Sequence, residues 1–419
     1  MGGEASKLGK RLRAWTTIML GALAISCATS TSVPEGSASA SATAARAANG
    51  TAPASSTASS TSAAAPSASA AKEKEAERVR YADLVNDLSE PDTYFFSDNL
   101  ISNETSFLQI ASELKKRADP AGVYIGVGPE QNFSYIALTK PSVAFVVDIR
   151  RANMLVHLLY RAAFEEAEGR AQFLALVIGR DPAKVPATPA TAGVADVLAA
   201  AQKPDASKSS FEAVHARLMK RIEGYGVKLE DKDRKALEKT HQTFFEEGVK
   251  IRFELKQANG RTYPTLEQLL ETTSPDGANG SFLATDESFQ VVQQMERAGR
   301  IVPLVGDFAG DRALPQLASY LKTENRRVST FYVSNVEQYL LEPKTWAKWV
   351  RNVKALPKTD DALFVRAYLD QGKKHPAQMK GHRTATVLAK MADFESLYGD
   401  KPTTTFWKLC TEKNVAPAT

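Results

Sequence analysis

The sequence predicts an α/β fold with a mostly parallel sheet, and three observations support this prediction. Residues 122–153 contain an apolar strand, a glycine turn, a short helix and a second apolar strand that ends in an acid. Apolar strand patterns return after residue 300, and the residues between are patterned as helices. Polar residues directly follow the strands, as at the ligand-binding edge of such sheets.

The first elements follow one another closely: strand Val123–Val127, a turn with Gly126 and Gly128, helix Gln131–Thr139, and strand Val143–Val147 ending at Asp148. Asp148 lies 22 residues after Gly126, near the spacing at which a carboxylate accepts both ribose hydroxyls. This order is that of a nucleotide-binding half of a Rossmann-like sheet.

The residues of the glycine turn limit the classes of ligand that it is expected to bind. Glycines let a ligand approach the backbone where a helix N-terminus exposes amide donors. Gln131 stands at the third small position of a dinucleotide fingerprint, and the Glu130 carboxylate beside it would repel a pyrophosphate, which argues against NAD or FAD. S-adenosylmethionine has no phosphate, and its ammonium tolerates a nearby acid. A degenerate fold without ligand, or a tight turn with an ordinary acid, remains an alternative.

Residues 151–298 are predicted to form a helical insertion between the second and third strands. Helices are expected over Leu155–Ala167, Phe211–Glu223, Asp231–Leu255, Leu266–Thr272 and Ser288–Ala298. Residues 180–207 are rich in Ala and Pro and predict a loop with a weak helix. His157 and His241 lie among apolar residues and are interpreted as core histidines.

The sheet pattern resumes in residues 299–419, the second part of the domain with a C-terminal extension. The expected strands are Ile301–Val305, Val328–Val333 and Ala362–Tyr368. Asp307 follows the first of these, and Ser334 and Asn335 follow the second. All three should meet Asp148 at the carboxyl edge of the sheet, where open α/β folds bind ligands. Each could also be an ordinary turn or cap residue.

Residues 1–27 are typical of a bacterial export signal of the lipoprotein type. A basic start precedes the apolar stretch Ala14–Ile25, which is too short for an ordinary transmembrane helix. It ends just before Cys27, the expected lipidation site, so that acyl chains would attach the protein to a membrane surface. A plain secretory signal and a retained N-terminal anchor are the alternatives.

Residues 28–71 consist almost entirely of Ala, Ser, Thr, Pro and Gly. Such a composition cannot offset the entropy of folding, so a disordered linker is predicted. The first part of the Rossmann-like domain is placed at residues 72–150. Within it, the segment before the first strand could cover the ligand, but the favoured interpretation is that Asn103 and Thr105 only cap a helix over Ser106–Lys116.

Composition excludes several kinds of site. Removing residues 1–27 takes away four of 53 basic and one of 48 acidic side chains, which leaves 49 against 47. That near balance gives no case for nucleic-acid binding. Cys410 is the only cysteine besides Cys27, so neither an intramolecular disulfide nor a cysteine-based zinc site is expected, and five scattered histidines give no metal-ligand spacing.

The order GVGPE, VVDIR, VGDF and YVSNVEQYL resembles that of class I S-adenosylmethionine-dependent methyltransferases. It is also similar to a little-characterised bacterial family of methyltransferase-like proteins that carry GVGPEQN, DIRR, GDF-G and YVSNVEQYL. The resemblance covers roughly residues 81–370. It implies that Gly126 and Gly128 approach the methionine part of the ligand, Asp148 takes the ribose hydroxyls and Asp307 binds the adenine amino group. It also implies that Ser334 and Asn335 face the methyl-transfer position.

The sequence departs from the methyltransferase pattern at Tyr124, where an acid is common, and at Glu130, in place of a third glycine. The sequence is therefore compatible with two functions. One is an adenosyl-ligand enzyme that transfers a methyl group to an unknown substrate. The other is a non-catalytic envelope lipoprotein that uses a degenerate fold to bind or scaffold a small molecule or an envelope protein. A serine hydrolase is weaker, because no G-x-S-x-G is present.

Overall fold

The structure is a computed structural model that describes residues 80–93, 95, 99–253, 262–370, 372–398 and 404–417. The predicted signal, Cys27 and the predicted linker lie outside the described residues. The described chain begins with a helix over residues 80–88. None of the helices described in these ranges is long and apolar enough to cross a bilayer.

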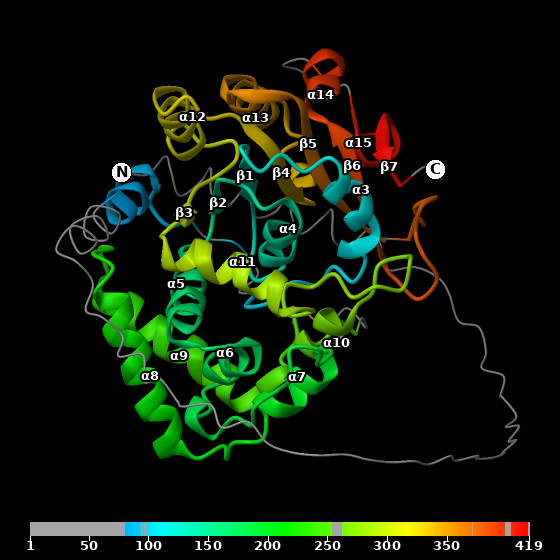
Figure 1. Ribbon diagram of the computed structural model, residues 1–419. Coiled ribbons are helices and arrows are strands. Elements are labelled where there is room, and N and C mark those ends of the chain that lie inside the picture. The colour runs from blue at the N-terminus through cyan, green and yellow to red at the C-terminus, as the bar shows by residue number, and fades with distance from the viewer. Residues whose placement is uncertain are drawn as a thin grey trace, which may run out of the picture. The chain divides into compact units, whose positions relative to one another are not determined.

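Seven strands of the described part form one sheet in the order β3-β2-β1-β4-β5-β6-β7. β6 pairs antiparallel with β5 and β7, and the other pairs are parallel. This confirms the predicted α/β fold with a mostly parallel, Rossmann-like sheet (Figure 1). The strands are β1 Val123–Gly126, β2 Val143–Asp148, β3 Ile301–Val305, β4 Val328–Ser334, β5 Lys358–Leu369, β6 Thr384–Lys390 and β7 Asn414–Ala416.

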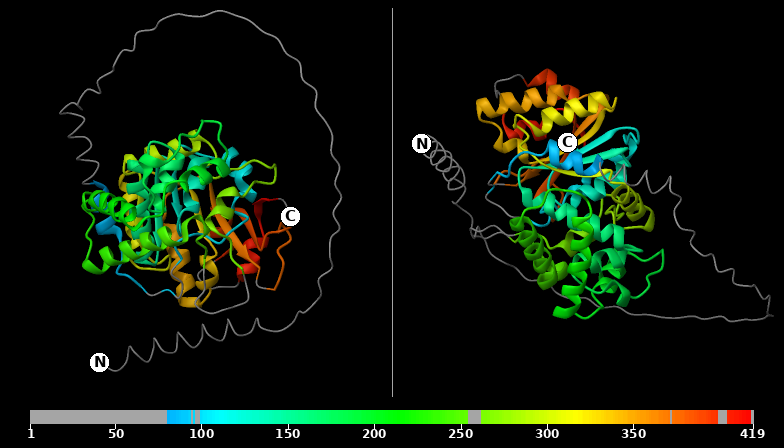
Figure 2. Two further views of the ribbon diagram at one scale, coloured as in Figure 1. Left: turned by 90° about the horizontal axis from the view of Figure 1, so that it is seen from below. Right: turned by 90° about the vertical axis from the view of Figure 1, so that its left-hand side faces the viewer.

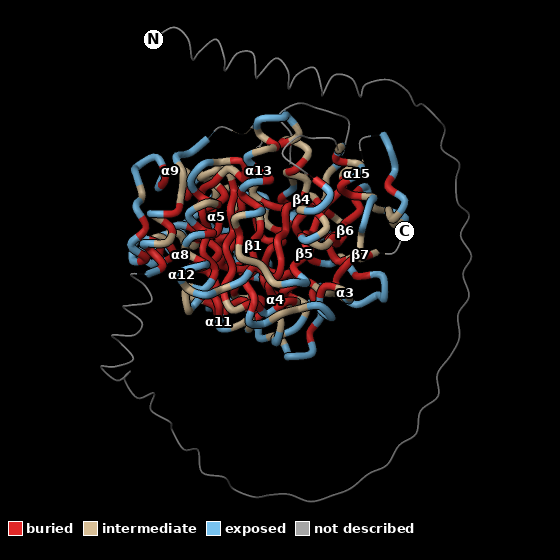
Figure 3. Tube along the Cα trace, turned by 90° about the horizontal axis from the view of Figure 1, so that it is seen from above, coloured by how far each residue is buried: buried red, intermediate tan, exposed pale blue. Residues whose placement is uncertain are grey.

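The order reverses between β1 and β4, so these neighbours form the topological switch point of the sheet. Ile125 of β1 pairs with Phe145 on one side and with Phe331 on the other. Every residue of strands β1 to β4 is buried. These strands lie in the buried centre of the molecule (Figure 3). Burial on both faces explains why they are nearly continuous apolar runs.

Helices cover both faces of the sheet (Figures 1 and 2). α12, α13 and α14 lie on one face, and α4, α5 and α11 lie on the other. The helices on the sheet are α3 Ala111–Lys116, α4 Gln131–Thr139, α5 Arg151–Glu166, α11 Asp286–Arg297, α12 Ala313–Thr323, α13 Pro343–Ala355, α14 Met391–Leu397 and α15 Phe406–Thr411. Short 3-10 helices precede α3 and follow β4, as η1 Phe107–Ile110 and η4 Val336–Tyr339.

The helical insertion extends below the sheet in Figure 1. It contains α6 Arg170–Val177, η2 Pro182–Lys184, α7 Val194–Ala201, α8 Lys208–Glu223, α9 Asp231–Glu247, η3 Gly248–Lys250 and α10 Leu266–Glu271. Its first helix, α5, packs against β2 and β3 and so belongs to the sheet layer. The prediction that one helix runs from Asp231 to Leu255 is wrong, because α9 ends at Glu247, just before Gly248, whose φ of 55° suits glycine.

His241 is a core histidine of the insertion. Its Nε2 lies 3.0 Å from the Leu176 carbonyl oxygen, and its Nδ1 lies 3.0 Å from Nδ1 of His215. Burial lowers the pKa of His241 to about 3, so its ring is neutral at physiological pH. The pair therefore shares a hydrogen bond between α8 and α9.

A buried ion pair fixes the chain after β4 against β5. Arg366 of β5 donates to both carboxylate oxygens of Glu337 in η4, one of them at 3.1 Å. Trp349 Nε1 donates to the same carboxylate at 3.2 Å. Because both charges are buried, each depends on the other for its polar partners.

We expect Glu337→Ala to lower the free energy of unfolding by about 3–5 kcal/mol, because Arg366 would stay buried without its counter-charge. Chemical denaturation followed by circular dichroism measures the change. Asp361→Ala breaks an ion pair with Lys390 in which the Asp361 side chain is 74% exposed, and it should leave the midpoint unchanged. Equal midpoints for both variants would contradict the importance of the buried pair.

Candidate functional site

The structure brings the predicted site residues to one edge of the sheet. Each lies at or just after the carboxyl end of a parallel strand: Gly126 and Gly128 at β1, Asp148 at β2, Asp307 at β3, and Ser334 and Asn335 at β4. This is the edge at which open α/β folds bind ligands. The polar partners of these residues determine what this edge can bind.

The glycine turn after β1 is held by helix α4. A Cβ on Gly126 would lie 1.9 Å from Oδ1 of Asn132, so this position needs glycine for internal packing. Asn132 Nδ2 in turn lies 2.8–3.0 Å from the carbonyl oxygens of residues 127–129. Gly128 differs, because it has a φ of 79° and a Cβ there would meet nothing within 4 Å. The turn is therefore closed at Gly126 and open at Gly128.

The Gly128 carbonyl oxygen also faces helix α5. Asn153 Nδ2 lies 3.1 Å from it, and His157 Nε2 lies 2.9 Å from it. Burial lowers the pKa of His157 to about 4, so the ring is neutral and donates its Nε2 proton. His157 thus fixes the turn and is held within the core beside Phe133 and Tyr160.

Asp148 lies at the position expected to take ribose hydroxyls, but its carboxylate is held by Arg150. The Arg150 backbone N–H and Nε donate to Oδ1 at 2.9 and 3.0 Å, and Nη2 donates to Oδ2 at 2.9 Å. Arg150 Nη1 also donates to the Asn99 carbonyl oxygen at 3.1 Å. Asp148 is only 5% exposed, so both of its oxygens are paired within the protein.

The switch point between β1 and β4 is filled by Glu104, which belongs to the chain before β1. Its carboxylate is 3% exposed and accepts hydrogen bonds from Ser334 Oγ and from Gln131 Nε2, the latter at 3.0 Å. Burial raises the pKa of Glu104 above its usual range. Ser334 itself has a φ of 52°, a left-handed conformation that is rare outside glycine.

A second buried carboxyl, Glu130, lies at the start of α4. Both of its oxygens accept from the Ser102 backbone N–H, at 3.1 and 3.2 Å, and Ser102 Oγ donates to Gln131 Oε1. Burial raises the pKa of Glu130 to about 7 in spite of these bonds. Residues 99–107, which we call the covering segment, therefore lie across the turn and the switch point.

The loop after β3 holds a third internal carboxylate, Glu90. Its oxygens accept from the backbone N–H groups of Asp307 at 3.1 Å, Arg312 at 3.1 Å and Ala313 at 2.7 Å. A Cβ on Gly310 would lie 2.3 Å from Glu90 Oε1. Asp307 Oδ1 accepts from the backbone N–H of Ala309 at 2.9 Å. The loop is thus an anion-binding loop whose anion is a side chain of the same protein.

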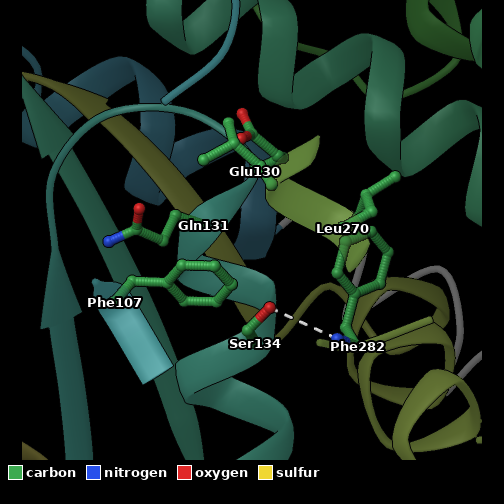
Figure 4. Close-up of a pocket in the computed structure, with 7 residues that line it drawn as sticks. Phe107, Glu130, Gln131, Ser134, Leu270 and Phe282 are labelled. Atoms are coloured by element: carbon green, nitrogen blue, oxygen red, sulfur yellow. Dashed lines mark hydrogen bonds between the residues drawn. The ribbon is translucent and has the colours of Figure 1, made fainter. Parts of the chain in front are cut away.

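A small cavity remains beside Glu130 (Figure 4). Its volume is about 10 Å³, which admits roughly one water molecule. Its walls are Phe107, Glu130, Gln131, Ser134, Leu269, Leu270 and Phe282. Ser134 Oγ accepts from the Phe282 backbone N–H at 3.2 Å, the bond drawn in Figure 4. The cavity is far smaller than the hundreds of cubic ångströms of an ordinary ligand pocket.

A model of a family described as a domain of unknown function (DUF7790) matches residues 99–225 and 198–414. The chain belongs to this family. No curated protein matches it. The family match begins at the first residue of the covering segment, so Ser102 and Glu104 belong to the matched region, whereas Glu90 precedes it.

The described residues contain no group of three or more His, Cys, Asp or Glu side chains arranged to hold a metal ion. The buried carboxyls Glu104 and Glu130 instead bind hydroxyl, amide and backbone donors. The site therefore offers two carboxyl groups with raised pKa, a strained serine and an open glycine turn.

Sequence reasoning missed the four residues that fill this edge: Glu90, Ser102, Glu104 and Arg150. Arg150 carried a usable signal, because an arginine two residues after a strand-ending acid can fold back onto it. The prediction that Asn103 and Thr105 cap the next helix is wrong. The N-cap residues of the two helices there are Ser106 and Ile110, neither of which makes a side-chain cap, and Thr105 Oγ1 instead lies 3.0 Å from Nδ1 of His382.

Glu130 should make stability depend on pH. Between pH about 4.5 and about 7 its carboxyl keeps a proton only in the folded state, so its contribution to stability is lost as pH rises through this window. We expect the difference in free energy of unfolding between Glu130→Gln and the wild type to change with pH. It should favour the variant by about 3 kcal/mol more at roughly pH 8 than at roughly pH 4. Denaturant titrations of both proteins measure it. A difference that does not vary with pH would contradict the assignment.

Proposed function

We propose that this chain is a bacterial envelope lipoprotein whose Rossmann-like domain is a non-catalytic binding or scaffolding module. The observation that carries the proposal is that residues before β1 occupy the ligand edge of the sheet. Glu90 fills the loop after β3, and Ser102 and Glu104 fill the turn after β1 and the switch point. The lipid anchor at Cys27 and the linker rest on the sequence alone.

The residues expected to hold S-adenosylmethionine do not fit that ligand in this conformation. The ribose acceptor Asp148 is paired with Arg150 through both oxygens. Asp307, expected at the adenine, accepts from its own loop. Ser334, expected at the methyl-transfer position, donates to Glu104. A ligand would have to replace these internal bonds before it made any of its own.

The cost of that replacement favours the non-catalytic function. Hydrogen bonds to charged groups contribute about 1.5–3 kcal/mol each. Releasing Asp148 and Glu104 would break several of them, at a cost on the order of 5 kcal/mol or more. Such a cost weakens apparent affinity by more than about a thousandfold. A micromolar adenosyl site would become one that needs more than millimolar ligand.

The adenosyl-ligand methyltransferase remains the second candidate, and the backbone at Ser334 favours it. A left-handed non-glycine residue at a switch point is strained, and such strain concentrates at ligand sites. The open space at Gly128 also lies where the methionine part of the ligand is expected. In this alternative the covering segment leaves the site before S-adenosylmethionine binds.

Calorimetric titration of the purified full chain with S-adenosylmethionine and S-adenosylhomocysteine separates the two functions. We expect no binding at millimolar ligand for the wild type, because the edge is filled. Micromolar binding that is lost in Asp148→Ala would overturn the proposal and support the methyltransferase. Ser319→Ala, on the exposed surface of α12, is the control and should behave as the wild type in either case.

The lipid anchor is tested separately in bacterial cells. Cys27→Ser should move the protein from the membrane fraction to the soluble fraction after a high-salt wash, because the acyl chains attach only at that cysteine. The matched control is Ser26→Ala, which leaves the cysteine in place. Membrane attachment of Cys27→Ser that resists the wash would count against lipidation.

A further inference from the structure

The loop between β5 and β6 carries a group of exposed cations. Lys373, Lys374, Lys380 and Arg383 all lie within residues 372–383, and each is exposed. In Figure 1 the loop is drawn in orange on the right, away from α8 and α9. We call these four residues, together with Trp407 of α15, the basic patch.

No carboxylate neutralises the patch within the described residues. None of its four cations takes part in an ion pair there, whereas Lys358 and Lys390, at the opposite ends of β5 and β6, are paired with Glu395 and Asp361. Asp370, at the start of the loop, accepts hydrogen bonds from the Gly372 backbone N–H and from Gln378. The patch therefore presents positive charge to its surroundings.

Hydrogen bonds hold the loop in one shape. His375 is buried, donates from Nε2 to the Cys410 carbonyl oxygen at 2.8 Å and accepts from the Ala377 backbone N–H at 3.1 Å. Gln378 Nε2 donates to the His382 carbonyl oxygen at 2.7 Å. His382 in turn contacts Thr105 of the covering segment. The part of the loop that carries the cations is thus held in one shape before any partner binds, which lowers the entropy cost of binding.

Trp407 gives the patch an aromatic component. The Lys373 ammonium lies 3.5 Å from the centre of the Trp407 ring, and that side chain is only partly buried. Partly exposed tryptophan beside lysine and arginine is typical of surfaces that meet lipid headgroups. Nucleic acid is the weaker partner, because basic and acidic side chains nearly balance in residues 28–419.

The proposed tether brings a membrane to this patch. The predicted linker, residues 28–71, is 44 residues long. A flexible chain of that length has a root-mean-square reach of roughly 40 Å, by the square-root rule for coil linkers. A lipid-anchored domain would therefore stay close to the bilayer, and contact with headgroups would be an intramolecular event of high effective concentration.

We propose that the basic patch docks the domain onto anionic phospholipid headgroups of the membrane to which it is tethered. The proposal rests on the proposed envelope location, but the contact itself needs no acyl chain. Docking would turn the carboxyl edge of β5, and with it the covering segment, toward the lipid surface. Each cation near an anionic bilayer is expected to strengthen binding by about fivefold.

Vesicle co-sedimentation of the full chain carrying Cys27→Ser tests the contact without an acyl anchor. The vesicles are phosphatidylcholine with and without phosphatidylglycerol. Lys374→Gln/Lys380→Gln/Arg383→Gln should weaken binding to the phosphatidylglycerol vesicles by roughly 100-fold. The matched control is Lys203→Gln/Lys235→Gln/Lys239→Gln, which removes three exposed cations of the insertion and should bind as the parent does.

Both triple variants keep the same N-terminus, so any contribution from residues 1–27 cancels in the comparison. Equal binding by the two, or no preference for phosphatidylglycerol, would overturn the proposal. The same variants are also tested for binding to polyglutamate and to DNA. If the triple variant of the basic patch lost binding to these polymers but still bound the vesicles, the proposal would be overturned in favour of a polymeric anion. Because no acyl group is present, either result is independent of the lipidation test. Equal unfolding midpoints would show that both variants are folded.

Discussion

The arrangement at the carboxyl edge of the sheet depends on the hydrogen bonds of the buried carboxyl group of Glu104. It joins the covering segment to α4 through Gln131 and to the end of β4 through Ser334. A carboxyl group in this position is costly to bury and stays only if its donors remain in place. Those donors come from two other stretches of the chain, so the strained turn at Ser334 and the covering segment stabilise each other.

The segment before the covering segment is fixed in a similar way. Arg161 of α5 lies between the rings of Tyr81 and Tyr225, with its guanidinium carbon 3.9 and 4.3 Å from their centres. This contact attaches the helix at 80–88 to the insertion. The same helix leads to Glu90, which binds the backbone N–H groups after β3. One N-terminal stretch thus crosses the carboxyl ends of β3, β2, β1 and β4 in turn.

This arrangement changes the meaning of motifs that are usually associated with ligands. Gly126 is needed because Asn132 lies against it, and Gly310 is needed because Glu90 does. A small residue at a turn shows only that something approaches the backbone closely. In this protein the group that approaches each glycine is a side chain of the same protein. The fold can therefore keep the residues of a ligand site while using them for internal contacts.

The order of β1 to β5 was readable from the sequence, because their apolar runs are local patterns, whereas β6, β7 and the helices after β3 were not predicted. The meeting of Asp148, Asp307 and Ser334 at one edge was also predictable, since parallel strands bring their carboxyl ends together. The sequence could not show what occupies that edge. Glu90 and Glu104 lie 217 and 230 positions from their partners Asp307 and Ser334.

Pairs so far apart in sequence leave no periodic or spacing signal, because only the folded sheet brings them together. The sequence by itself determined the class of fold and the residues at the carboxyl ends of its first four strands. Whether that edge is open or filled was decided by the tertiary structure, since it depends on whether buried carboxylates from another segment find their hydrogen-bond donors there.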